Sequence, residues 1–233
     1  MDINCYLAMT AAEYFSADTL PNKVAWMACH FASYGTGISN KPDSLPPGSM
    51  LILNDRIPPR NHDPIQISEE MNHLIHKYGC SSVLLDFQEH NNNELKSIAA
   101  YLSEDLTVPV GIAEEYAKDL NCCVFLNAPA LQKDLAEAIK VWSGRKLWLE
   151  IAPEAEEYII TEAESKVIQS ECCECDDTWY KDKSLHCSYS YQLTGDHAHL
   201  NIQRSFEDLK ELMEEAGTIG VERFVGLYQQ LNK

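Results

Sequence analysis

Acidic side chains stand at or just after several apolar runs of the chain, and three of them are candidates for proton transfer. They are Asp86, Glu150 and Asp55. Paired carboxylates suit general acid–base chemistry, because like charge and partial burial push their pKa values apart. Hydrolysis of a glycosidic bond uses such a pair. We therefore predict a hydrolase for a carbohydrate or another small polar substrate. Asp86 and Glu150 would act as acid and base or nucleophile, and Asp55 would support them.

Further polar residues follow the same runs and are predicted to bind the substrate. They are His30, Tyr34, Arg56, Gln88, Glu114, Tyr116, Asn127 and Tyr228. Structural alternatives exist, because a strand-end carboxylate often caps a helix or pairs with an arginine, and such networks imitate active sites. For His30, a core histidine is the structural alternative and the one that we favour. The glycine-rich loop at 34–39 lacks the glycine and lysine spacing of a phosphate-binding loop, so a plain turn is its alternative.

The apolar runs themselves predict strands. They cover residues 5–9, 24–31, 49–54, 82–87, 108–113, 122–126, 146–152 and 223–228. Most are continuously apolar, which is typical of strands that are covered on both faces. Amphipathic segments between them predict helices at 67–79, 93–105, 133–142 and 205–220. Ser68 is the expected cap of the first of these helices, and Gly79 is its expected end.

Strands that alternate with helices favour βαβ units and a parallel sheet. We predict an α/β fold: an abbreviated (β/α)8-like TIM barrel that forms one domain over residues 1–233. An open doubly wound sheet is the alternative. In either architecture the active site lies at the carboxyl ends of the strands, where the candidate residues converge.

The segment 153–204 departs from the alternation of strands and helices and is predicted to be a β-rich acidic insertion. Two alternating stretches within 185–203 flank the turn Thr194-Gly195-Asp196 and predict an antiparallel hairpin. A free edge of that hairpin could pair with its copy in a second subunit, which would make a homodimer.

The insertion also carries a cysteine-rich stretch. Cys172, Cys173 and Cys175 precede His186 and Cys187, and thiolates with a nearby histidine could hold zinc. The spacing is not a repeated CxxC pair, and an exposed thiol-rich loop is the alternative. We therefore predict no cofactor and no metal, and keep a divalent-metal site in the insertion as a third hypothesis.

Charge and composition limit the partners and the compartment. The chain has 36 acidic and 18 basic residues and a net charge of −18, which argues against a nucleic-acid or anionic-membrane partner. It has no signal-peptide pattern and no membrane-spanning apolar run. Nine scattered cysteines fit a reducing environment. We expect a cytoplasmic protein whose partner is a small molecule such as a saccharide.

The segments 26–40, 45–56, 81–88 and 109–117 resemble a group of uncharacterised bacterial proteins found mainly in gut anaerobes. That group looks like distant relatives of the (β/α)-barrel glycoside hydrolases, so the resemblance implies a barrel fold. The family-18 chitinases place a DxxDxDxE signature after their fourth strand. Its nearest counterpart here is Leu84-Leu85-Asp86-Phe87-Gln88, with Gln88 at the position expected for a catalytic acid. This departure implies an alternative function: a non-catalytic sugar- or metabolite-binding or interaction protein on a degenerate barrel.

Overall fold

A computed structural model describes residues 4–27, 42–55, 63–127, 132–152, 156–161, 168–169, 178–183, 186–194 and 197–227. Parallel strands form a closed barrel in the order β1-β13-β7-β6-β5-β4-β3-β2. These strands are β1 (Cys5–Met9), β2 (Val24–Met27), β3 (Met50–Asn54), β4 (Ser82–Asp86), β5 (Val110–Ala113), β6 (Cys123–Leu126), β7 (Leu147–Ile151) and β13 (Val221–Leu227). The predicted TIM barrel is confirmed. The open sheet is wrong, because β1 pairs with both β2 and β13.

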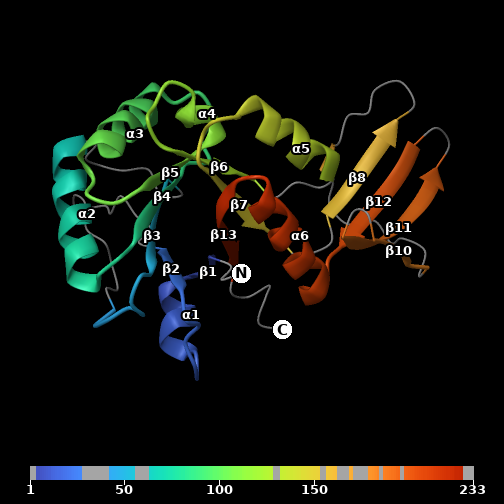
Figure 1. Ribbon diagram of the computed structural model, residues 1–233, viewed down its shortest axis with the longest axis horizontal. Helices are drawn as coiled ribbons and strands as arrows, with labels where there is room; N and C mark the ends of the chain where they lie inside the picture. Colours follow the sequence, from blue (N-terminus) through green and yellow to red (C-terminus); the bar gives the residue numbers. More distant parts are fainter. Residues whose placement is uncertain are drawn as a thin grey trace.

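Helices lie outside the ring of strands (Figure 1). They are α1 (Ala11–Ser16), α2 (Pro64–Tyr78), α3 (Asn93–Asp105), α4 (Glu114–Ala117), α5 (Gln132–Val141) and α6 (Phe206–Thr218). The expected cap of α2 is wrong: the helix begins earlier, at Pro64, because the Asp63 side chain accepts the N–H of Ile65. Ser68 lies inside the helix and is buried. Gly79 ends the helix in the left-handed conformation, as predicted.

The barrel interior is filled by one apolar cluster. Its members alternate along the strands with residues that face the helices: Tyr6, Ala8, Ala25, Met50, Ile52, Leu84, Cys123, Phe125, Trp148 and Val225. Trp148 is fully buried, and its indole lies across Gly111 of β5. The barrel is therefore a packed core, as in other TIM barrels.

Polar contacts cross the barrel at the amino ends of the strands. The Arg223 guanidinium donates to the Tyr6 hydroxyl and lies over the Trp148 ring, 5.2 Å from its centroid. The Ser81 hydroxyl lies 3.2 Å from that of Tyr6 and donates to the carbonyl oxygen of Gly48. These side chains occupy the amino end of the barrel. In TIM barrels, ligands bind at the opposite end, where the strands have their carboxyl ends.

The insertion forms a five-stranded sheet in the order β10-β11-β12-β8-β9, between β7 and α6. Its strands are β8 (Glu156–Thr161), β9 (Ile168–Gln169), β10 (Tyr180–Asp182), β11 (Cys187–Thr194) and β12 (His197–Gln203). Figure 1 shows it to one side of the barrel, beyond α6. The predicted hairpin is β11 with β12, in antiparallel register.

Neighbouring strands cover the hairpin in part, and among the described residues β10 reaches only Cys187–Tyr189 of β11. Strand β11 pairs with β10, and β12 pairs with β8. The edges of the described sheet are β10 and β9. The homodimer stays a prediction. Among the described residues, no helix is long and apolar enough to cross a membrane.

Candidate functional site at the carboxyl end of the barrel

The inner face of the barrel turns polar where the strands end. Residue alternation puts Asn54 on the inner face after Ile52, Asp86 after Leu84, and Glu150 after Trp148. The next inward position after Phe125 is Asn127, one residue beyond β6. Asn54 and Asp86 are also direct partners in the register of β3 and β4. The fold thus gathers Asp86, Glu150 and Asn127 at one end.

Asn54 was not among the predicted site residues. It is 1% exposed, whereas Asp86 and Glu150 are partly exposed. In the sequence, Asn54 could have been identified from its place two and four residues after Ile52 and Met50, which puts the three side chains on one face of the strand. This signal is weak, because the residues between them are also apolar and do not show which face is the inner one.

Gln88 occupies the position two residues beyond Asp86. Its side-chain amide donates a hydrogen bond of 2.5 Å to Asp86 Oδ1. An amide carries no acidic proton, so Gln88 can orient Asp86 but cannot protonate a leaving group. Gln88 itself is exposed.

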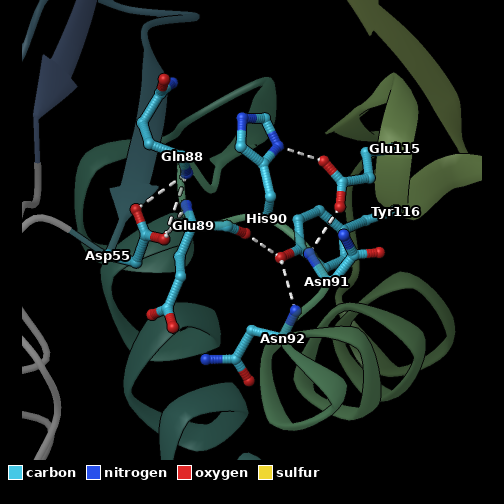
Figure 2. Close-up of polar contacts among 8 residues, drawn as sticks. All are labelled: Asp55, Gln88, Glu89, His90, Asn91, Asn92, Glu115 and Tyr116. Atoms are coloured by element: carbon cyan, nitrogen blue, oxygen red, sulfur yellow. Dashed lines mark hydrogen bonds and ion pairs between the residues drawn. The ribbon is translucent and has the colours of Figure 1, made fainter.

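Asp55 clamps the loop that follows β4. Its carboxylate accepts the backbone N–H of Gln88 at 2.9 and 3.1 Å and that of Glu89 at 2.8 Å. Figure 2 shows the carboxylate beside the backbone of this loop. Both oxygens are engaged, so the geometry favours Asp55 as a positioning residue for Gln88.

Glu115 holds the next part of the same loop. Its carboxylate accepts the N–H of Asn91 at 2.6 Å and lies 2.5 Å from Nδ1 of His90 (Figure 2). The hydrogen bond to Glu115 and its charge raise the pKa of His90, and the same hydrogen bond lowers the pKa of Glu115. Asn91 has a φ of 56°, a left-handed conformation that asparagine tolerates. The loop turns sharply here into α3.

Tyr116 lies under this loop, not on its surface. It is 4% exposed, and its hydroxyl donates to the carbonyl oxygen of Glu89 and accepts the N–H of Asn92 at 3.4 Å. Its ring meets that of Phe87 edge to face, with centroids 5.9 Å apart. Tyr116 therefore supports the loop, although the sequence predicted it to bind substrate.

Glu114 accepts a hydrogen bond of 3.3 Å from Nε1 of Trp142, just beyond the end of α5. The remaining predicted residues, His30, Tyr34, Arg56 and Tyr228, lie outside the described residues.

The zinc hypothesis stays a prediction, because Cys172, Cys173 and Cys175 lie outside the described residues. Of the other two members, Cys187 is buried, and burial raises the pKa of its thiol. Both ring nitrogens of His186 contact carboxylates. Within the part of the chain that the structure covers, no group of three metal-ligating side chains is present.

Comparisons with solved structures find the same fold in carbohydrate-active enzymes. A glycoside hydrolase family 18 chitinase from Cycas revoluta, solved with (GlcNAc)4, aligns with a TM-score of 0.58 at 10% identity, covering 96% of this chain and 94% of that chain. The spore cortex-lytic enzyme SleL from Bacillus cereus aligns with a TM-score of 0.55 at 6% identity, covering 96% and 70%. SleL from Bacillus megaterium gives 0.54 at 6%, with the same coverage.

These likenesses show a shared fold. No protein-family model matches the chain, and no curated protein matches it. The resemblance to proteins of gut anaerobes therefore stays a prediction.

Proposed function

We propose that the chain binds a saccharide at the carboxyl end of its barrel without hydrolysing it. Asn54, Asp86, Asn127 and Glu150 would supply hydrogen-bonding groups to the sugar hydroxyls. The observation that carries this proposal is the hydrogen bond from Gln88 to Asp86. The side-chain amide of Gln88 donates to the inward-facing carboxylate of Asp86. Gln88 thus places an amide two residues after Asp86, at the position where hydrolysis would need a proton donor.

The surrounding contacts support a binding role. Asp55 and Glu115 both hold the loop of Gln88 through its backbone. Glu114 contacts Trp142, and Tyr116 is buried beneath the loop. Three polar side chains that follow β3 and β5, namely Asp55, Glu115 and Tyr116, thus build a rigid rim around the loop after β4. Preorganised rims reduce the entropy lost when a ligand binds.

N-acetylglucosamine oligomers are the first ligands to test. The Cycas revoluta chitinase, which has the same fold, was solved with (GlcNAc)3 and (GlcNAc)4. The proposed class of ligand is therefore a short amino-sugar chain. Other oligosaccharides should be tested beside it.

Hydrolysis is the second candidate function. It is favoured by the presence of two inward-facing carboxylates, Asp86 and Glu150, on strands β4 and β7 of one barrel. In this alternative they would be the acid and the base or nucleophile. Product analysis separates the two functions, because only hydrolysis releases shorter sugars.

Replacing Asp86 tests the proposal. Titration calorimetry with (GlcNAc)4 and with a panel of neutral oligosaccharides should show binding by the wild type and no products after long incubation. Asp86→Ala should weaken binding about tenfold or more, because a hydrogen bond to a charged group is lost. The matched control is Glu104→Ala, which removes an exposed acid of α3 and should leave affinity unchanged.

Two outcomes would contradict the proposal. If no oligosaccharide binds the wild type, the site is not a saccharide site. If sugars bind and are cleaved, and Asp86→Ala or Glu150→Ala stops the cleavage, hydrolysis replaces binding as the function.

A further inference from the structure

The inserted sheet contacts α6 through a histidine at the start of β11. Nδ1 of His186 lies 3.1 Å from Oε2 of Glu211, and Nε2 lies 2.7 Å from Oε2 of Glu215. The His186 side chain is 15% exposed, whereas the side chains of Glu211 and Glu215 are 54% and 46% exposed, so water reaches the two carboxylates but little of the ring. Its φ of 48° is left-handed, and this uncommon backbone conformation is found at the start of the strand.

This geometry requires a charged ring. Each ring nitrogen of His186 faces an oxygen of an ionised carboxylate, which can only accept a hydrogen bond. A neutral imidazole donates from one nitrogen only, so its other nitrogen would face Glu211 or Glu215 lone pair to lone pair. The imidazolium donates from both nitrogens and satisfies both carboxylates.

The two glutamates lie four residues apart on α6 and repel each other when nothing stands between them. A cation between them removes this repulsion. Burial by itself lowers the pKa of His186, but the hydrogen bonds and charges of Glu215 and Glu211 outweigh burial, so the pKa is raised above its usual value. The charged ring and the glutamates stabilise each other.

Other charged and titratable groups lie at this contact. Lys181 of β10 lies 3.5 Å from Asp208 of α6. Burial raises the pKa of Asp208, but the Ser205 hydrogen bonds and Lys181 outweigh it and lower that pKa overall. Cys187 is buried near Arg204, Asp182 and Asp208, and burial raises the pKa of its thiol, which stays neutral.

We propose that His186 is a pH-dependent latch, which holds the start of β11, and with it the inserted sheet, against α6 when charged and loosens this contact when it loses its proton.

The direction follows from the raised pKa. A group whose pKa is higher in the folded state stabilises fully below its unfolded value, here about pH 6.5, and loses that contribution as the pH rises through the folded value. The latch is therefore closed in mildly acidic solution and opens as the pH rises past the raised pKa of His186. Lys181 and Asp208 form a separate contact between the sheet and α6, so the sheet loosens locally around β11.

Hydrogen exchange measured by mass spectrometry tests the latch on the full chain without ligand. Rates for peptides that cover 186–194 are compared between about pH 5.5 and about pH 9, after correction for intrinsic exchange. In the wild type, corrected exchange should rise about fivefold with pH. His186→Asn, whose side chain tolerates the left-handed backbone, should exchange fast at both pH values.

Two further variants separate the latch from general instability. Glu215→Gln keeps a hydrogen-bonding side chain but removes one charge, so it should reduce the pH dependence without unfolding the sheet. His90→Asn removes another carboxylate-paired histidine, 84% exposed and outside the insertion, and should behave as the wild type.

Corrected exchange that is equal at both pH values in the wild type would overturn the proposal, as would an unchanged pH dependence in His186→Asn. The exchange test involves no saccharide, so its outcome is independent of the proposed function.

Discussion

Replacing Gly111 by alanine is expected to lower the free energy of unfolding by about 3 kcal/mol, a large effect for one methyl group. A Cβ at this position would lie 2.1 Å from Cε3 and 2.4 Å from Cζ3 of Trp148. The indole is rigid and 0% exposed, and the apolar interior of the barrel surrounds it. Neither the new methyl group nor the indole can move away unless β5 or β7 shifts. Urea denaturation followed by circular dichroism measures the loss.

A double-mutant cycle isolates the contact. Trp148→Leu should itself cost about 3 kcal/mol, because it leaves a cavity in the core. In that background Gly111→Ala should cost about 1 kcal/mol or less, since the new methyl group then fills part of the cavity. If the two losses simply add, the clash with the indole is not the cause of the destabilisation.

The barrel was predictable because its strands are buried on both faces. Runs such as 49–54 and 82–87 are continuously apolar, and the strands formed there, β3 and β4, end at Asn54 and Asp86. The contact between Gly111 and Trp148 was not predictable, since the residues lie on β5 and β7 and meet only inside the closed barrel. The order of the insertion strands likewise depends on long-range pairing.

The candidate site was predictable in position and less so in the role of each residue. Strand ends identified Asp86 and Glu150, which alternation places on the inner face. Roles depend on partners that sequence does not reveal. Tyr116 follows a strand like a binding residue, yet its hydroxyl bonds to the backbone of Glu89. Asn54 is an inward polar residue at the end of an apolar run.

Asp55→Ala is expected to lower the free energy of unfolding by about 2 kcal/mol and to release the loop after β4. The wild-type carboxylate accepts the backbone N–H groups of Gln88 and Glu89. Alanine leaves both without their charged acceptor, and water at the partly exposed site replaces only part of the loss. Chemical denaturation measures the stability, and amide exchange of the two residues measures the loop.

Two further variants serve as comparisons for the stability loss expected of Asp55→Ala. Asp55→Asn keeps one acceptor oxygen and should lose about half as much stability. Glu89→Gln changes an exposed acid of the same loop and should leave the stability unchanged. Under the proposed function, Asp55→Ala should also weaken saccharide binding, because Gln88 and Asp86 lose their fixed arrangement. Unchanged amide protection at Gln88 and Glu89 would show that the loop does not depend on Asp55. The rigid rim would then have to come from Glu115 and Tyr116 alone.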